Sequence, residues 1–255
     1  MSAAFTEYVD VAQIALYLFW IFFFGLVYYI RKTDRREGYP VEKEKGGFGS
    51  SGWFWLPEPK EYKLAHGHGS YFAPHDKRDD RDFALERTAN WPGAAYEPTG
   101  NPMKDAVGPA AYAMRDDHPE LTRTGENLIV PMRVATDYSI FAPSKDVRGW
   151  EVFGTDGEKA GTVKDIWVDR ADQMVRYLEV ELDGDGGDRL LPMPLALLRE
   201  NPYRVTVDSI TSAQFADVPT TRDPGSITAL EEDKVAAYYA GGKLYNGKLR
   251  FGPLV

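Results

Sequence analysis

The first thirty residues contain one long run of apolar positions. Val11 to Ile30 reads VAQIALYLFWIFFFGLVYYI, and Gln13 is its only clearly polar side chain. A helix of about 20 residues spans roughly 30 Å, which is close to the thickness of the hydrocarbon core of a bilayer. The pattern therefore predicts one transmembrane helix over residues 11–30, with the short segment 1–10 on one side of the membrane and a polar body on the other.

A cleaved secretory signal is the alternative to a membrane anchor. Such a signal needs a basic leader, a shorter apolar run and a small-residue cleavage site. Here the leader carries Glu7 and Asp10 and no Lys or Arg, and the basic residues follow the run instead. We therefore interpret the run as an anchor, and the positive-inside rule predicts a cytoplasmic body with the N-terminus outside.

Side chains suited to the membrane surface flank the apolar run. Tyr8 and Tyr17 near its start, and Tyr28 and Tyr29 at its end, are typical of interfacial belts. Residues 31–45 contain six Lys or Arg against four acids, which favours attraction to anionic headgroups as well as a topology signal. The membrane-interface and lipid candidates are Tyr28, Tyr29, Arg31, Lys32, Arg35 and Arg36.

The composition of residues 31–132 is not typical of a packed core. Gly, Pro and charged residues recur every few positions, yet aromatic residues such as Trp91 and Tyr96 argue against plain disorder. Long loop-rich stretches usually have a function, are disordered or lie against a neighbour. We expect an extended segment across a partner surface, with short strands at Tyr62–Leu64 and Ser70–Phe72 and no assigned conformation for 46–55.

From residue 133 to 255 the pattern changes to short β-favouring runs between turn clusters. The turn clusters fall at 155–158, 169–173, 183–188 and 199–202. The expected strands are Trp150–Phe153, Gly161–Val168, Arg176–Leu182, Arg189–Met193 and Tyr203–Val207. Strands at this spacing predict a small antiparallel barrel, in which closure removes exposed edges. The fold class is thus a single transmembrane helix followed by a mainly-β domain.

A short C-terminal helix completes the predicted domain. Thr228 and Glu231 have the spacing of a capping box, and acidic residues at 231–233 suit the positive end of a helix. Gly241 fits the C-terminal cap, so the helix is expected over about 230–240. A shorter helix is expected around Ser212–Ala216, and the tail after residue 247 has no assigned conformation.

Composition narrows the classes of function. The chain has a formal charge of −9, and an acidic body argues against nucleic acid as a partner. It contains no cysteine, which excludes disulfides, thiolate metal sites and iron–sulfur clusters. No serine-hydrolase elbow or HExxH motif is present, so the sequence offers no positive case for an enzyme.

Three histidines leave a metal-dependent enzyme open as an alternative. His66 and His68 lie two residues apart, and His75 follows downstream. Imidazoles at such spacing can share a metal ion. Their glycine-rich surroundings favour a mobile loop instead.

A group of carboxylates gathers around residues 163–182. Taken singly, each is typical of a solvated rim on a barrel. Together they suggest an acidic surface that collects protons and passes them to a buried acceptor in a partner. That role would require pKa values raised towards neutrality for the inner members. The group consists of Asp165, Asp169, Asp172, Glu179 and Glu181.

The order and spacing of several motifs resemble the H subunit of the photosynthetic reaction centre of purple bacteria. The motifs span nearly the whole chain and follow the single N-terminal apolar run. They are REGYP at 36–40, PTGNPMKDAVGPAAY at 98–112, VPMRVA at 130–135, AGTVKDIWVD at 160–169, RYLEVEL at 176–182, LLPM at 190–193 and EEDKVAAYYAGG at 231–242.

The resemblance implies a cytoplasmic domain of the PRC-barrel type that caps the L and M subunits on their quinone side. It implies that this chain binds no redox cofactor, while L and M hold bacteriochlorophyll, bacteriopheophytin, quinones and non-haem iron. It further implies support of assembly and electron transfer, proton delivery to the secondary quinone, a surrounding light-harvesting antenna ring and a cytochrome subunit. The expected location is the bacterial photosynthetic inner membrane.

Some positions of the family's proton route carry over. Asp169, Asp172 and Arg176 match positions near the entry of that route. The family's surface histidine pair falls at Thr124 and Glu126, neither of which is histidine, and His118 lies a few residues upstream. The proton-entry candidates are therefore Asp169, Asp172, Arg176, Glu126 and His118.

A second class of function remains beside this one. The same pattern fits an independent membrane-tethered barrel that binds a protein or a ligand without photosynthetic partners. Both readings divide the chain in the same way. The segments are 1–10, the helix 11–30, the loop-rich stretch 31–132 and the barrel domain 133–255.

Overall fold

The structure is a computed structural model that divides into two compact units, Met1–Asp79 and Asp80–Val255. Tyr8, the stretch 46–55 and the tail after residue 247 lie outside the described residues. Those described are 10–39, 56–75, 79, 81–91, 94–184 and 186–246.

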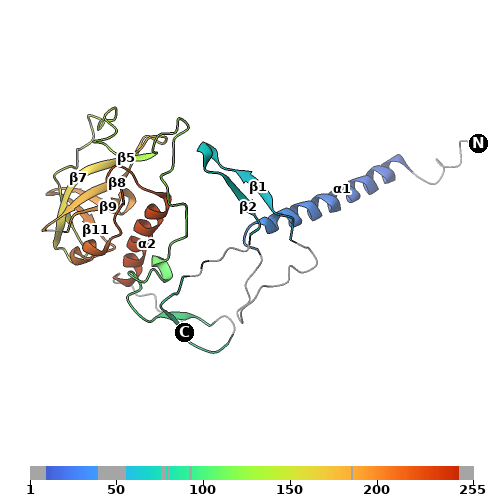
Figure 1. The fold of residues 1–255 in the computed structure, drawn as a ribbon, viewed down its shortest axis with the longest axis horizontal. Helices are drawn as coiled ribbons and strands as arrows, with labels where there is room; N and C mark the ends of the chain where they lie inside the picture. Colours follow the sequence, from blue (N-terminus) through green and yellow to red (C-terminus); the bar gives the residue numbers. More distant parts are fainter. Residues whose placement is uncertain are drawn as a thin grey trace, which may run out of the picture. The chain divides into compact units, whose positions relative to one another are not determined.

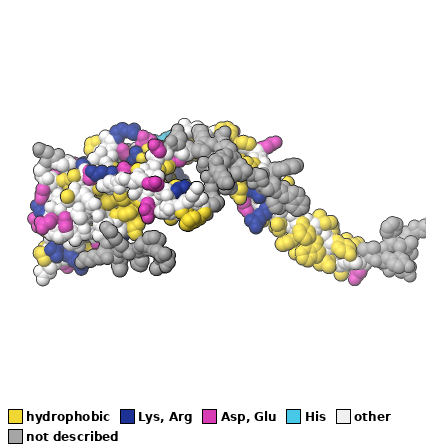
Figure 2. Space-filling view, turned by 90° about the horizontal axis from the view of Figure 1, so that it is seen from below, with side chains coloured by type: hydrophobic (Ala, Val, Ile, Leu, Met, Phe, Trp, Pro, Cys, Tyr) yellow, Lys and Arg dark blue, Asp and Glu magenta, His cyan; other side chains and the backbone are white. Residues whose placement is uncertain are grey.

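The N-terminal apolar run forms helix α1 (Val11–Thr33) (Figure 1). The Asp10 carboxylate caps it by accepting a hydrogen bond from the Ala12 amide at 3.2 Å. Its surface is almost entirely hydrophobic, as Figure 2 shows. By length and composition, the helix with its following turn could cross a membrane, and no other helix among the described residues could. This fits a single-pass membrane protein. The helix covers the predicted residues 11–30 and continues for about one turn beyond them, while the membrane crossing itself stays a prediction.

A β-hairpin follows in the same unit, after the 3₁₀ turn η1 (Asp34–Arg36). Strands β1 (Lys60–Lys63) and β2 (Ser70–Ala73) pair antiparallel around η2 (Ala65–Gly67), close to the predicted strand positions. Arg36 Nη1 donates to the Glu58 carbonyl at 2.7 Å and lies 3.4 Å from the Ala73 carbonyl oxygen. The side chain of Arg36 therefore ties the base of the hairpin to the end of the helix.

The second unit contains a seven-stranded sheet in the order β10-β11-β6-β7-β8-β9, with β5 beside β7 (Figure 1). A separate hairpin, β3 (Leu85–Arg87) with β4 (Tyr96–Pro98), precedes it. Within the described residues the ladder is an open path whose ends, β9 and β10, are joined by η4 (Met193–Leu195). The strands are β5 (Ile129–Pro131), β6 (Glu151–Phe153), β7 (Lys159–Asp169), β8 (Met174–Leu182), β9 (Asp188–Pro192), β10 (Ala196–Glu200) and β11 (Tyr203–Val207).

Five of these strands were predicted within about two residues, and the mainly-β class is confirmed. Two strands were missed: β5, and β10, whose last residues Arg199 and Glu200 had been assigned to a turn. The prediction of a wholly antiparallel barrel is wrong at one place, because β11 runs parallel to β6 with Val205 opposite Val152. Four strands lie between β6 and β11 in the sequence, so β11 can pair with β6 in either direction. The alternation of apolar and polar residues within a strand does not determine that direction.

The core lies between the concave face of this sheet and the elements that cover it. Val152, Leu178, Leu191 and Val205 have no exposed surface. Because successive strand residues point to opposite faces, these side chains come from alternate positions, and their neighbours on the strands face away. The longest hairpin, β7–β8, therefore carries one apolar face and one face rich in carboxylates.

Helix α2 (Ala229–Tyr245) begins at the predicted capping box: the Glu231 amide donates to Thr228 Oγ1 at 3.1 Å, and the Thr228 amide donates back to the Glu231 carboxylate at 2.9 Å. The predicted end is wrong. Gly241 and Gly242 are helical, and the cap is Asn246. A Cβ on Gly241 would lie 2.6 Å from the Cβ of Ala110. The glycines thus permit close packing against η3 (Gly108–Ala110).

The predicted short helix near Ser212 is confirmed as a 3₁₀ helix, η5 (Ser212–Asp217). Its Phe215 side chain is fully buried and meets the ring of Tyr239 from α2 edge-on, with centroids 6.2 Å apart. This contact fixes α2 to the segment that leaves β11. The helix in turn lies close to β9 (Figure 1).

Candidate functional site

The turn between β7 and β8 brings Asp169, Asp172 and Arg176 together. Asp169 Oδ1 accepts hydrogen bonds from the backbone amides of Ala171 at 2.8 Å and Asp172 at 3.0 Å. Its Oδ2 accepts from Arg176 Nε at 3.0 Å and Nη2 at 2.9 Å. The Asp169 side chain thus shapes the turn and holds the guanidinium.

Asp169 does not have the raised pKa that was expected of an inner proton carrier. Although it is almost fully buried, and burial opposes ionisation, two backbone amides and the guanidinium outweigh that cost and lower its pKa. Asp169 is therefore an ionised anchor at neutral pH. Its contacts position Arg176, and a role for Asp169 in proton entry stays a prediction.

Arg176 and Asp172 lie further out from the same turn. Arg176 Nη2 also donates to Asp172 Oδ2 at 2.9 Å, and the Asp172 side chain is 60% exposed. The hydrogen bond and charge of Asp169 raise the pKa of Arg176, although burial acts against this. Arg176 is therefore a permanent cation between a buried and a solvated carboxylate.

The protonatable group of this site is Glu232 on α2, which the sequence analysis had assigned only to the helix dipole. Tyr177 donates its hydroxyl to Glu232 Oε2 at 3.0 Å. Burial, together with the negative charge of Glu120, raises the pKa of Glu232, while Tyr177 and two arginines partly oppose the shift. Burial also raises the pKa of the Tyr177 hydroxyl, so that it remains a donor.

No sequence signal could have identified Glu232, because its environment comes from strands and loops distant in the chain. Arg115 Nη2 lies 2.7 Å from Glu120 Oε1, and its Nη1 lies 3.8 Å from the Asp233 carboxylate. The arrangement combines fixed charges, a solvated carboxylate and a half-buried carboxyl group that gains a proton more readily than usual. Such a set can exchange protons with water at the surface.

The two other proton-entry candidates are Glu126 and His118. Glu126 Oε2 is 3.5 Å from Nη1 of Arg170, the residue after Asp169, and both line a pocket of about 530 Å³. His118 lies at the start of α2, where its carbonyl accepts from the Ala229 amide at 3.2 Å and its ring is 3.7 Å from the Asp116 carboxylate. The structure thus brings Glu126 to the β7–β8 turn and His118 to the helix.

Comparison with known families explains the combination of apolar helix, loop-rich segment and barrel-type sheet. The family described as photosynthetic reaction centre, H-chain N-terminal region, matches residues 3–134, and the PRC-barrel domain matches residues 139–214. The first match covers more than half of the chain. The chain belongs to the reaction-centre H-chain family. The H chain is a non-catalytic subunit, its family implies association with the L and M subunits, and the cofactors are held by those partners.

A second charged cluster lies on the outward face of the β7–β8 hairpin of this H chain. Asp165 and Glu179 are opposite each other in the ladder, and both are buried. Arg133, just after β5, donates to both carboxylates, at 3.0 Å to Asp165 Oδ2. Although burial opposes its charge, these two carboxylates raise the pKa of Arg133. We call these three residues the Arg133 cluster.

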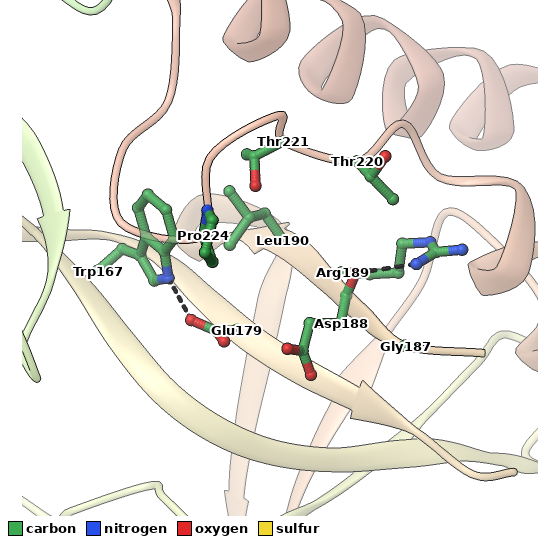
Figure 3. Close-up of a pocket in the computed structure, with 9 residues that line it drawn as sticks. All are labelled: Trp167, Glu179, Gly187, Asp188, Arg189, Leu190, Thr220, Thr221 and Pro224. Atoms are coloured by element: carbon green, nitrogen blue, oxygen red, sulfur yellow. Dashed lines mark hydrogen bonds between the residues drawn. The ribbon is translucent and has the colours of Figure 1, made fainter. Parts of the chain in front are cut away.

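Glu179 also forms one wall of a small pocket of about 310 Å³ (Figure 3). Trp167 and Glu179 face each other from β7 and β8, and the indole Nε1 donates to Glu179 Oε2 at 2.7 Å. The loop that carries Thr220 and Thr221 crosses over the strands (Figure 3). Arg133 and Trp167 both donate to the same oxygen of Glu179, and Arg133 also donates to the Pro224 carbonyl, so that Arg133 links Glu179 to the covering loop.

The histidine alternative has no support in the described part of the H chain, where no group of three or more His, Cys, Asp or Glu could hold a metal ion. The His75 ring is engaged otherwise, since its Nε2 lies 2.8 Å from the Tyr71 hydroxyl across β2. The turn cluster predicted at 183–188 joins β8 to β9, and Asp185 lies outside the described residues.

The membrane-interface candidates lie at the C-terminal end of α1. Tyr28 and Tyr29 are exposed on the helix, and Arg31 and Lys32 occupy its last turn. The guanidinium of Arg35 stands 5.4 Å from the centroid of the Tyr39 ring. Arg36, as described above, binds hairpin carbonyls, so at least one of the predicted lipid ligands has an internal role. Lipid contact by this set remains a prediction.

Proposed function

We propose that this H chain covers the cytoplasmic, quinone-side face of the L and M subunits. It supports their assembly and light-driven electron transfer, and it helps to deliver protons to the secondary quinone. The observation that carries the proposal is the H-chain family match over residues 3–134, which includes α1 and the whole hairpin segment. The acidic surface around the β7–β8 turn supports the proton-delivery part.

Charge on either side of α1 supports the proposed orientation. Four basic residues lie within the segment 31–36, directly after the apolar run, whereas residues 1–10 contain none. The positive-inside rule then gives a periplasmic N-terminus and a cytoplasmic body in a bacterial photosynthetic membrane. A surrounding antenna ring and a cytochrome subunit are further proposed partners, and 31–132 is proposed to lie on the partner surface.

The proton step follows from the site residues. Asp172 is exposed to water at the surface, while Asp169 holds Arg176 in place beside it. Glu232 is the half-buried group whose pKa is raised, and the Tyr177 hydroxyl orients one of its two carboxylate oxygens. A proton taken up at the surface can therefore reside on Glu232 before it passes inward.

The test is flash-induced proton uptake in intact reaction centres that carry Asp172→Asn together with Glu232→Gln. We expect proton uptake coupled to the second reduction of the secondary quinone to slow, because the double variant lacks both the solvated and the half-buried carboxyl group. Primary charge separation should stay intact. Glu158→Gln, an exposed carboxylate in the β6–β7 turn, is the matched control. Unchanged uptake in a correctly assembled double variant removes both residues from the route.

Purification in mild detergent tests the subunit assignment itself. We expect the H chain to copurify in a coloured complex that absorbs in the near infrared. A colourless monomer, obtained repeatedly from photosynthetically grown cells, would contradict the proposal. It would favour the independent membrane-tethered binding module instead.

A further inference from the structure

A larger cavity opens into the barrel-type sheet beside the segment 138–145. Its volume is about 590 Å³, inside the roughly 300–1,000 Å³ range of small-molecule sites. Ile166 from β7 and Leu178 from β8 line it, although their side chains are only 2% and 0% exposed. The cavity therefore reaches into the hydrophobic core and is more than a shallow surface groove.

The walls of this cavity are mostly apolar and able to adapt. Three of the six methionines of the chain, Met132, Met174 and Met193, line it. Methionine has an unbranched, polarizable side chain that adjusts to irregular ligands. At the rim, Phe141 is 73% exposed and leaves a large apolar surface beside the opening. The interior thus suits the apolar part of a ligand.

The mouth of the cavity carries a cation. Lys145 Nζ stands 5.8 Å from the centroid of the Tyr203 ring, which in turn packs against the ring of Trp150. In the part of the chain that the structure describes, no carboxylate oxygen lies within 4.0 Å of this ammonium. Glu200, the other charged residue on the lining, is exposed at the end of β10, where water screens its charge.

We propose that this cavity binds a single-chain amphiphile, with its apolar chain among the methionines and its anionic head beside Lys145. A fatty acid and an anionic monoacyl lipid share this chemistry. A chain that enters at the mouth removes its own apolar surface from water, together with that of exposed lining residues such as Phe141 and Met174. The inference goes beyond the proposed function, since it assigns a ligand to an apolar cavity and uses none of Asp169, Asp172, Arg176 and Glu232.

Trp150 at the mouth provides a direct reporter of binding. The full chain is placed in nanodiscs of phosphatidylcholine, which avoids detergent, and titrated with 2-bromododecanoate, whose bromine lies next to the carboxylate and quenches tryptophan on contact. We expect a saturable, one-to-one loss of fluorescence on top of the gradual quenching caused by partition into the bilayer. Trp150→Phe should remove the saturable part. Brominated lysophosphatidylglycerol, tested in the same way, distinguishes a free fatty acid from a lipid.

Two variants separate cavity binding from surface adsorption. Val175→Phe adds volume inside the cavity and should abolish saturable quenching, whereas Leu197→Phe, the same kind of change at a β10 residue outside the lining, should not. Lys145→Gln alters only the mouth and cannot unfold the core. It should weaken binding of 2-bromododecanoate roughly fivefold, as a solvated charge-assisted contact predicts, and leave neutral 2-bromododecanol unaffected.

The proposal is overturned if wild-type quenching never saturates, or if folded Val175→Phe protein binds as the wild type does. Equal effects of Lys145→Gln on the acid and the alcohol would remove the anionic-head assignment. A cavity open in the isolated chain but closed to 2-bromododecanoate in the assembled complex would mean that a partner's side chains occupy it, and this also overturns the proposal. None of these results depends on proton uptake, so failure here leaves the proposed function intact.

Discussion

Replacing Arg133 with methionine would leave two buried carboxylates without the cation they share. The guanidinium contacts Asp165 and Glu179 on neighbouring strands and also donates to the Pro224 carbonyl of the covering loop. Methionine keeps much of the apolar stem but supplies no donor. The change therefore tests whether the Arg133 cluster holds β5, β7, β8 and the loop together by charge or merely by packing.

The expected cost follows from burial. Breaking a buried ion pair by removing one partner typically costs about 3–5 kcal/mol, because the remaining charge stays desolvated. The Asp165 and Glu179 side chains are 8% and 3% exposed, but the Arg133 side chain is 39% exposed, so water screens part of the interaction. We therefore expect the lower end, about 3 kcal/mol. For a unit of this size, that corresponds to a fall in Tm of about 6–12 °C.

The assay is thermal unfolding of the full chain in nanodiscs, followed by circular dichroism at neutral pH. Lys104→Met is the matched control, because its 2.9 Å ion pair with Asp217 lies at the surface and should contribute less than about 1 kcal/mol. Adding Asp165→Asn and Glu179→Gln to Arg133→Met replaces both charges with neutral groups of similar shape. This triple variant should recover most of the lost stability.

Two results would refute the reasoning. If Arg133→Met costs no more than Lys104→Met, the cluster does not contribute through buried charge. If the triple variant is less stable than Arg133→Met by the full sum of the added changes, packing and hydrogen-bond shape outweigh the uncompensated charges. Coupling between neighbouring residues is what such a cycle measures.

Two further predictions concern α2. The pKa of Glu232 is raised in the folded chain, so its negative charge destabilises the fold above that pKa, and this cost disappears as the pH falls below it. In thermal unfolding, Glu232→Gln should therefore stabilise the chain at pH 8 relative to wild type, with a smaller difference at pH 4.5. A difference that does not depend on pH would contradict this. Gly242→Ala would place a Cβ 2.5 Å from the Ser209 carbonyl oxygen. Although alanine has the better helix propensity, we expect the free energy of unfolding, measured with denaturant, to fall by about 1–2 kcal/mol. A gain in stability would show that the backbone moves to accommodate the Cβ.

Local patterns in the sequence were sufficient for the elements that form from neighbouring residues. The apolar run at 11–30 is long enough to specify α1 without any packing partner, and α1 is indeed exposed along its length. The capping box at Thr228 predicted the start of α2 to within one residue, because both partners lie within a single turn. Alternation over 175–182 predicted β8, since the pleat repeats every two residues.

Tertiary structure alone decided what depends on residues far apart in the chain. The parallel pairing of β11 with β6, the continuation of α2 through Gly241 and the shared contacts of Arg133 all join segments separated by dozens of residues. The pKa shifts of the carboxylates also depend on the tertiary structure. Asp169 has a lowered pKa and Glu232 a raised one, although both are acids in acidic stretches. The sequence determines which residues can carry a charge. Their desolvation and their hydrogen-bond partners, which shift the pKa values, arise only when the chain folds.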